Sequence, residues 1–176
     1  MTPQNKVVAV TGTPGTGKTA ACALLKGIML IDLRKVAEEH SDLFTTDEER
    51  GSLEIDPLDL RGLLPAAKGV VVIEGHLAHL MDPDMVIVLR CSPKVLRKRL
   101  KARGWPEKKV QENVEAEAVD VILLEALGAS KNVFEIDTTE MRPKEVADAI
   151  ASIIAGEKAK YRPGNIDWSG EVLDWY

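Results

Sequence analysis

Cysteine is scarce in this chain of 176 residues, which contains only Cys22 and Cys91. These two cysteines form no zinc-binding pattern. Each lies in an apolar segment, so we expect buried free thiols in a reducing compartment. Basic residues are not in excess either, because 23 Lys and Arg stand against 28 Asp and Glu and give a net charge of −5. This balance argues against a wholly basic nucleic-acid binder, although it is compatible with a local basic patch.

Long apolar runs are missing as well. No stretch reaches the ~18 uninterrupted apolar residues of a membrane span, and the first ten residues lack the apolar core of a signal peptide. Hydrophobic residues nevertheless make up 45 % of the chain, as in a globular domain with a sizeable core. We therefore expect a soluble, cytoplasmic protein whose residues 1–176 form a single domain without membrane contact.

Five short apolar segments alternate with segments of helical character. The expected strands comprise residues 6–12, 28–31, 69–75, 84–90 and 132–137. The expected helices comprise residues 17–27, 32–40, 56–67, 92–104, 105–128 and 142–156. This alternation predicts an α/β fold, in which right-handed crossovers join a five-stranded parallel sheet with helices on both faces.

Local signals support several of these helices. Three side chains suit N-cap positions, namely Asp32, Asp56 and Ser92. In the helix expected over 105–128, four apolar residues lie near helical spacing: Val110, Val114, Val121 and Leu124. The last helix has an apolar face made of Val146, Ile150 and Ile153.

Two segments show little regular pattern. Residues 41–56 are polar and irregular. The tail 157–176 is polar but contains Trp168, Trp175 and Tyr176. The tail docks either on a partner or on its own domain, and we prefer the second interpretation.

A glycine-rich segment follows the first strand. Residues 12–19, GTPGTGKT, match G-x-x-x-x-G-K-[ST] at every fixed position. Glycines let such a loop turn its backbone N–H groups toward phosphate oxygens, and the following helix directs its positive end at the same charge. Lys18 then reaches the β- and γ-phosphates, and the Thr19 hydroxyl ligates Mg²⁺. Because the segment joins a strand to a helix, we predict a P-loop NTPase fold that binds a nucleotide.

A carboxylate from a neighbouring strand is expected to complete the magnesium site. Glu74 ends the strand predicted over 69–75, and His76 lies two residues further on the same rim. Open α/β sheets bind their ligands at this rim. Glu74, His76 and His79 are also compatible with a zinc site, but the spacing lacks a defined helical motif and further ligands. We prefer Glu74 and His76 at a catalytic site, with His79 as a structural residue.

Basic residues gather in the helix predicted over 92–104. Arg99 and Arg103 are four residues apart and share a face. Arg103 precedes Gly104, where a mobile flap would let it neutralise a transferring phosphoryl group. The alternative is a solvated basic face, because the segment also contains Arg97, Lys98 and Lys101.

Together these motifs resemble the adenylate kinase-like nucleoside monophosphate (NMP) kinases, and most closely the small archaeal and eukaryotic branch called adenylate kinase isoenzyme six. The resemblance covers about residues 6–155. It rests on TGTPGTGKT, on IEGH, on VIVLRCSPKVLRKRLKARGW, on PEKKVQENVEAE and on the RP before the last helix. The RGW-x-x-x-K-x-x-E-N pattern within it is far more specific than the P-loop.

The resemblance implies an NMP-binding insertion over about residues 32–56 and a short lid over about 102–112. It assigns ATP contacts to Gly15, Gly17, Lys18, Thr19, Ala20, Arg103 and Arg142. It places Glu74 and His76 in a Walker B-like motif. At position 74 many relatives have Asp, so the longer Glu side chain is expected to reach the metal through water.

The acceptor side departs from the family pattern. Many adenylate kinases have an acidic residue followed three positions later by an Arg that grips the AMP phosphate. Here Lys35 follows Asp32 at that spacing, and Arg34 lies one position earlier. Lysine does not replace arginine in a bidentate phosphate contact. The NMP-binding candidates are therefore Asp32, Arg34, Lys35 and Arg50.

The predicted reaction is the Mg²⁺-dependent, reversible conversion of ATP and AMP into two ADP. The resembled branch also suggests a rival, an ATPase switch that acts with a small-subunit ribosomal protein or rRNA during ribosome maturation. A kinase for another small acceptor and a nucleotide-binding adaptor without turnover are further alternatives. Assays of ATP loss with and without AMP separate the kinase from the switch.

Overall fold

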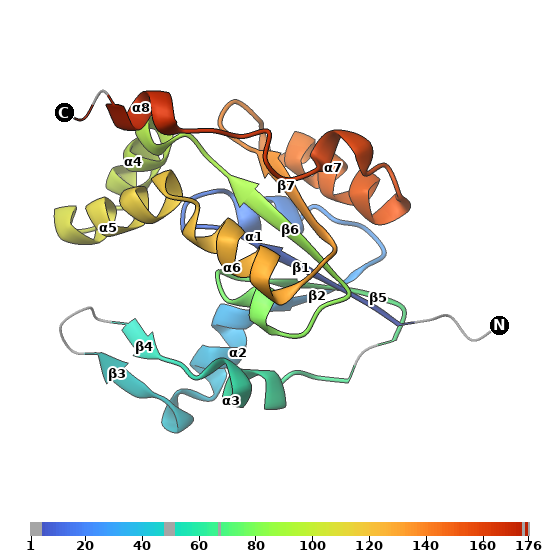
Figure 1. Cartoon of the computed structure of the whole chain (residues 1–176). Helices are drawn as coiled ribbons and strands as arrows, with labels where there is room; N and C mark the ends of the chain where they lie inside the picture. Colours follow the sequence, from blue (N-terminus) through green and yellow to red (C-terminus); the bar gives the residue numbers. More distant parts are fainter. Residues whose placement is uncertain (1–4, 48–51, 67, 174, 176) are drawn as a thin grey trace.

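A parallel sheet of five strands forms the centre of the computed structural model, which describes residues 5–47, 52–66, 68–173 and 175 (Figure 1). The strand order is β2-β5-β1-β6-β7. The strands are β1 Lys6–Thr11, β2 Met29–Asp32, β5 Val70–Glu74, β6 Met85–Arg90 and β7 Val133–Asp137. All four pairings are parallel, which confirms the predicted sheet.

Helices cover both faces of the sheet because side chains along each strand alternate between them. Val8 and Val10 of β1 pack with α1 (Lys18–Cys22) and α7 (Pro143–Ala155). Ala9 belongs to the opposite core, together with residues of the following helices: α2 Leu33–Glu39, α3 Pro57–Gly62 and α6 Val121–Ala129. Every residue of β6 is buried, as expected of an inner strand covered on both faces.

A third apolar cluster joins α4 (Pro93–Ala102) to α5 (Glu107–Ala118). Its buried side chains are Cys91, Leu96, Leu100, Val110 and Val114. Only residues 103–106 connect the two helices. The lid expected over 102–112 therefore falls on this tight connection and on the first turns of α5.

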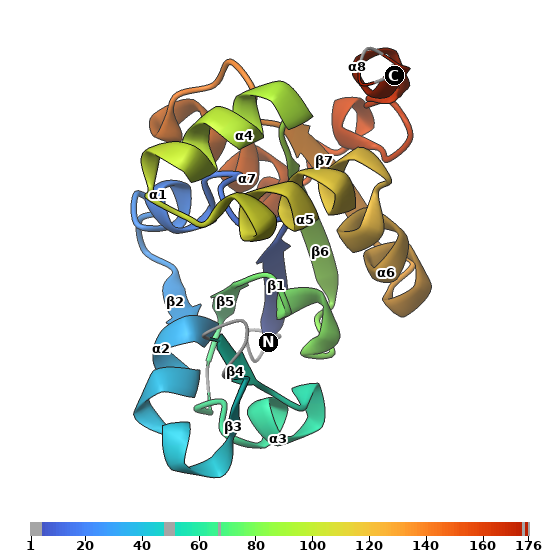
Figure 2. The same ribbon diagram turned by 90° about the vertical axis from the view of Figure 1, so that its left-hand side faces the viewer.

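The segment between α2 and α3 contains regular structure that the sequence analysis did not predict. A 3-10 turn over Ser41–Leu43 precedes an antiparallel hairpin of β3 (Thr45–Asp47) and β4 (Ser52–Glu54). The prediction of an irregular 41–56 was wrong, because strands of three mostly polar residues show no apolar alternation. In both views this hairpin, α2 and α3 lie toward the bottom of the molecule, and α4 and α5 lie above them (Figures 1 and 2).

The helix expected over 105–128 is broken in two. Asp120 adopts a left-handed conformation with φ 60°, and its carboxylate pairs with the buried Arg90. As a result α6 runs in a new direction, and Leu124 is 61 % exposed although it lies near the helical spacing of Val110 and Val114. Val110 and Val114, which precede the break, are fully buried as predicted.

Two other helices are shorter than expected. After Cys22 the hydrogen bonds of α1 change to an i→i+3 pattern, and Gly27 turns the chain toward β2 with φ 69°. The helix expected over 56–67 ends at Gly62. The three predicted N-caps are confirmed, since Asp32, Asp56 and Ser92 accept bonds from amides of the first helical turn. The apolar face of α7 is also confirmed as buried.

The C-terminal tail packs on its own domain, as we preferred. Trp168 is only 9 % exposed. The short helix α8 (Ser169–Leu173) lies beside α4, where Glu171 Oε2 accepts a hydrogen bond of 3.1 Å from the Lys94 amide (Figure 1). Both cysteines are buried and unpaired, as expected. Among the described residues, no helix combines the length and the apolar character that a membrane crossing requires.

Candidate active site

The glycine-rich loop connects the carboxyl end of β1 to α1, and its shape depends on two glycines. Gly12 has φ 140°, and a Cβ there would lie 2.3 Å from the Leu89 carbonyl oxygen. Gly15 has φ 95°, and a Cβ there would lie 2.9 Å from side-chain atoms of Leu96 and of Leu100. Larger residues at either position would push the loop away from β6 or α4.

Hydrogen bonds within the loop and from the turn after β7 fix the shape of this loop. The Thr16 hydroxyl donates to the Thr13 carbonyl at 2.9 Å, and the Thr138 hydroxyl donates to the Thr16 carbonyl at 2.8 Å. The first amides of α1 have no acceptor within the helix, and Gly17 at the N-cap has no side chain to cap them. The loop therefore presents N–H groups that suit an anion such as a phosphate.

Lys18 is folded back onto the loop. Its Nζ donates to the carbonyl oxygens of Gly12 at 2.6 Å and Thr13 at 3.0 Å. Burial lowers the pKa of its ammonium group to about 8, and the nearby Glu74 carboxylate partly opposes this shift. A buried cation with two neutral acceptors is poorly compensated, so this group is suited to receive a phosphate charge.

Glu74 lies beside the loop at the carboxyl end of β5. In the sheet it pairs with Val10 of β1 and with Asp32 of β2. Burial raises the pKa of its carboxyl group, while a hydrogen bond from the Thr19 side chain and the charge of Lys18 lower it. The Thr19 hydroxyl and the Glu74 carboxylate are hard oxygen donors of the kind that Mg²⁺ prefers, so these residues suit a magnesium ion bound with ATP phosphates.

The two histidines after Glu74 have different surroundings. His76 is exposed at the rim, where desolvation by the surrounding chain and the positive charge of Lys18 lower its pKa, so the ring is neutral at pH 7. His79 is buried, with Nδ1 3.1 Å from the Thr11 hydroxyl and Nε2 3.0 Å from Glu125 Oε2. With both ring nitrogens engaged within the protein, His79 fits the structural role that we preferred and has no free nitrogen for a zinc ion. No group of three or more potential metal ligands occurs within the described ranges.

The arginines differ in what they contact. Arg99 donates to the carbonyl oxygens of Gly15 at 3.4 Å and Thr138 at 2.9 Å, so it ties α4 to the loop. Arg103 is exposed at the end of α4, and its charge contributes to the lowered pKa of Lys18. Arg99 therefore supports the glycine-rich loop through hydrogen bonds. Arg103 makes its contribution through its charge, which acts on Lys18 of that loop.

Arg142 lies at the N-cap of α7 and is exposed. Its Nε donates to Glu145 Oε2 at 3.2 Å in a capping arrangement. To reach ATP, as the family resemblance implies, its guanidinium would have to leave this pair. Gly15 is buried within the loop, whereas Thr19 and Ala20 are exposed at the start of α1.

The acceptor-side candidates differ in their contacts and in their exposure to solvent. The Asp32 carboxylate caps α2 by accepting from the amides of Arg34 at 3.0 Å and Lys35 at 3.3 Å. The Arg34 side chain is 85 % exposed and pairs with Glu38 at 2.7 Å. Lys35 is exposed on the first turn of α2, and its charge is among the influences that lower the pKa of Glu74, after the Thr19 hydrogen bond and Lys18. Arg50 lies outside the described residues.

The sequence analysis missed the contacts that hold the loop from a distance. Thr138, in the turn after β7, bonds to Thr16, and Glu117 of α5 accepts a hydrogen bond of 2.6 Å from the Thr13 hydroxyl. These partners are 122 and 104 residues apart in the chain. Glu117 ends the PEKKVQENVEAE segment, but nothing local in that segment pairs it with the P-loop, so only the tertiary structure reveals these contacts.

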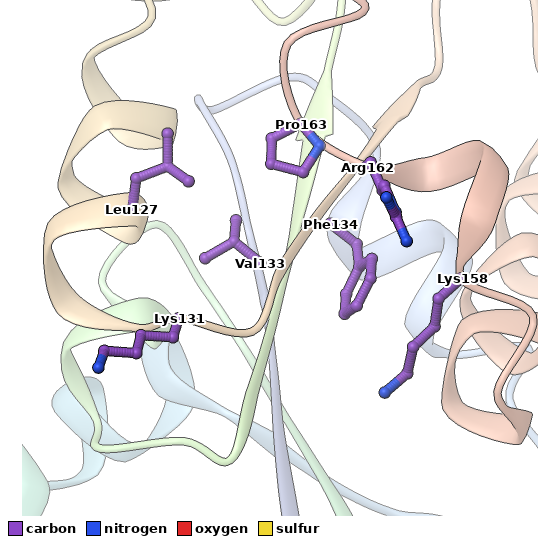
Figure 3. Close-up of a pocket in the computed structure, with 7 residues that line it drawn as sticks. All are labelled: Leu127, Lys131, Val133, Phe134, Lys158, Arg162 and Pro163. Atoms are coloured by element: carbon purple, nitrogen blue, oxygen red, sulfur yellow. The ribbon is translucent and has the colours of Figure 1, made fainter.

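A cavity of about 450 Å³ lies away from the loop (Figure 3). Its lining comprises Leu127, Lys131, Val133, Phe134, Lys158, Arg162 and Pro163. Val133 and Phe134 begin β7, whereas the glycine-rich loop follows the end of β1. In a parallel sheet the first residues of one strand and the last residues of another lie at opposite ends of the strands. This cavity is therefore not the candidate nucleotide site.

A P-loop between a buried parallel strand and a helix, with a carboxylate at the end of the adjacent strand, defines an α/β P-loop nucleotide-binding protein. Consistent with this class, a family model described as an AAA domain matches residues 8–120. A protein of Archaeoglobus fulgidus named "Putative adenylate kinase" is 47 % identical over 173 residues, which cover 96 % of this chain and 94 % of that protein. A protein of the same name from Methanothermobacter thermautotrophicus is 43 % identical, with coverages of 95 % and 99 %. The chain belongs to the family of these archaeal proteins.

Solved structures with low sequence identity share the fold. Shikimate kinase from Acinetobacter baumannii superposes with a TM-score of 0.61 at 15 % identity, over 89 % of this chain and 97 % of that chain. Thymidylate kinase from Candida albicans gives a TM-score of 0.52 at 13 % identity, over 87 % and 92 %. These matches confirm the predicted P-loop kinase fold.

Proposed function

We propose that this protein is a nucleotide kinase that transfers the γ-phosphoryl group of ATP to AMP and forms two ADP, reversibly. The observation that carries the proposal is the convergence of Lys18, Thr19 and Glu74 at one end of the sheet. The names of the archaeal relatives and the kinase fold of the structural neighbours support the same reaction class. The choice of ATP as donor and AMP as acceptor is our proposal.

In this reaction an AMP phosphate oxygen attacks the γ-phosphorus, and the bond to the β–γ bridging oxygen breaks. The protein supplies positioning and charge rather than a nucleophile. Lys18 moves its charge from the Gly12 and Thr13 carbonyls to the β- and γ-phosphates. Arg103, at the end of α4, and Arg142, once released from Glu145, balance the remaining negative charge of ATP.

Magnesium belongs to this reaction as the partner of ATP. When bound, Mg²⁺ neutralises phosphate charge, and Thr19 and Glu74 are the residues of this chain that would hold it. Glu74 stands where many relatives have aspartate, and we propose that it would act on the metal through a bound water. Gly15, Gly17 and Ala20 complete the ATP site through the backbone of the loop and of α1.

On the acceptor side, we propose that Lys35 binds the phosphate of AMP. Lys35→Ala is expected to raise the KM for AMP roughly tenfold or more, because a hydrogen bond to a charged group contributes about 1.5–3 kcal/mol. Arg34→Ala is expected to change this KM less than about threefold, since Arg34 faces solvent and pairs with Glu38. Steady-state kinetics at saturating ATP measures both values, and a larger effect of Arg34→Ala would reverse the assignment.

A second candidate function is ATP hydrolysis. One observation favours it: residues 103–106 alone link α4 to α5, and we expect so short a lid to exclude water poorly. His76 is also neutral at the rim and is suited to orient a water molecule. The ribosomal partner, the isoenzyme-six branch and the cytoplasmic location stay predictions.

One assay separates transfer from hydrolysis. Purified protein with Mg²⁺ and ATP is incubated with and without AMP, and ADP and free phosphate are quantified. A kinase forms two ADP per ATP consumed, only when AMP is present and with little free phosphate. Equal rates of phosphate release with and without AMP would identify an ATPase instead, and a panel of other monophosphates tests acceptor choice.

A further inference from the structure

A buried carboxylate links the P-loop to the interior of the domain. Glu117 is 2 % exposed, and its Oε2 accepts the hydrogen bond of 2.6 Å from Thr13. Its Oε1 accepts from Arg90 Nε at 2.8 Å, from the Cys91 amide at 3.2 Å and from Trp168 Nε1 at 3.3 Å. One side chain of α5 therefore contacts the P-loop, β6 and the C-terminal tail.

A second buried carboxylate extends this network along the tail. Glu135 of β7 accepts from Arg90 Nη1 at 3.2 Å through Oε2. Its Oε1 accepts from the three successive amides of Gly164 at 2.9 Å, Asn165 at 3.0 Å and Ile166 at 3.3 Å. We call residues 164–168 the C-terminal strap, because they donate four hydrogen bonds to these two carboxylates.

The strap supplies several of the hydrogen-bond donors of this network. Arg90 is a single guanidinium, and it faces the carboxylates of Glu117, Glu135 and Asp120. Buried carboxylates are tolerated only when further donors satisfy their remaining lone pairs. The strap supplies three amides and an indole N–H, and the Cys91 amide and the Thr13 hydroxyl are further donors to Glu117. Removing the strap would leave Glu117 and Glu135 under-satisfied, and Glu117 would lose part of what fixes its contact with Thr13.

We propose that Glu117 is a positioning residue for the P-loop, and that docking of the C-terminal strap and nucleotide binding strengthen each other through Arg90, Glu117 and Thr13. Coupling of two sites is reciprocal by thermodynamic necessity. A docked strap therefore favours the nucleotide-binding shape of the loop, and a bound nucleotide tightens the strap. The proposal rests on nucleotide binding at the P-loop, as in the proposed function, but it does not require phosphoryl transfer.

Amide hydrogen exchange measures the docking of the strap directly, because three of its backbone amides donate hydrogen bonds to Glu135. Exchange at Gly164, Asn165 and Ile166 is compared in the full-length protein with and without saturating ADP and MgCl₂. We expect ADP to slow this exchange at least about fivefold, the lower end of typical allosteric couplings. Unchanged exchange in protein that demonstrably binds ADP would overturn the proposal.

Two variants interrupt the network at its ends. Thr13→Val removes only the hydroxyl that contacts Glu117, so we expect the strap to remain docked but its exchange to respond no longer to ADP. Trp168→Phe removes the indole N–H. We expect this change to raise the Kd for ADP roughly tenfold, which corresponds to about 1.4 kcal/mol of binding free energy. Trp175→Phe is the matched control, because Trp175 is 40 % exposed and lies beyond the strap.

Glu117→Gln tests the central residue at constant shape. An amide cannot accept all four hydrogen bonds, so we expect the Kd for ADP to rise and the effect of ADP on strap exchange to disappear. Glu112→Gln, on the exposed face of the same helix, serves as the control. Calorimetric binding and circular dichroism of each variant show whether it is folded. An ADP response retained in folded Thr13→Val or Glu117→Gln would overturn the coupling, whereas absence of ADP binding in the unmodified protein would overturn the proposed function instead.

Discussion

Lys18→Met is expected to reduce kcat/KM for ATP by roughly 10³-fold or more, which corresponds to about 4 kcal/mol of transition-state stabilisation. Methionine keeps the apolar stem of the side chain but removes the charge. Among the residues that the structure describes, only the Gly12 and Thr13 carbonyls accept hydrogen bonds from this charged group, so it is available to the phosphates. In a desolvated site, loss of a preorganised charge has large effects on the developing negative charge. Initial-rate measurements of ADP formation test this result.

The control for this variant is Lys26→Met, because Lys26 is exposed and follows α1. It should retain the activity of the unmodified protein. If Lys18→Met stays within ~10-fold of the unmodified protein, which is under about 1.4 kcal/mol, the P-loop lysine does not supply the charge and the mechanism is wrong.

The lowered pKa of Lys18 adds a pH-dependent readout to the same prediction. In the free protein burial holds this pKa at about 8, and phosphate charge in the complex raises it again. Above about pH 8 the free amine is largely neutral and must take up a proton on binding, so ATP affinity should fall as the pH rises through 8. Calorimetry in buffers of different ionisation enthalpy measures this uptake. It should be small below pH 7 and missing in Lys18→Met.

Glu74→Gln is expected to lower kcat roughly 10²-fold or more for both transfer and hydrolysis, with a raised Mg²⁺ requirement. The amide keeps the shape of this nearly buried side chain but removes the negative charge next to Thr19 and Lys18. A neutral ligand holds a hard divalent cation less well than a carboxylate does. Activity measured across a series of Mg²⁺ concentrations tests the prediction, and Glu39→Gln on the exposed face of α2 is the control.

His76→Ala separates two roles at the same corner. We expect it to lower ATP hydrolysis while largely preserving transfer to AMP, because a water-orienting group serves only hydrolysis. If both reactions survive unchanged in Glu74→Gln and in His76→Ala, this end of β5 has no catalytic function.

The predicted part of the site follows from local sequence. The P-loop is one contiguous motif, so Lys18 and Thr19 could be identified without the fold. Glu74 could be predicted because a short apolar run ends at it, and parallel strands end at the same edge of a sheet. The hairpin of β3 and β4 could not be predicted, because its stability comes from cross-strand pairing between short polar segments. The break at Asp120 was missed for a related reason, since its cause is the ion pair with Arg90 from another strand.

The sequence by itself therefore determined the alternation of strands and helices, the helix caps at Asp32, Asp56 and Ser92, and the phosphate-binding motif. These features depend on contacts between residues close in the chain. Only the tertiary structure decided that Arg34 pairs with Glu38 in solvent, that both nitrogens of His79 are engaged, and that the C-terminal strap is joined to Thr13 through buried charges. Those outcomes depend on desolvation and on pairing between distant segments, which arise only when the chain is folded.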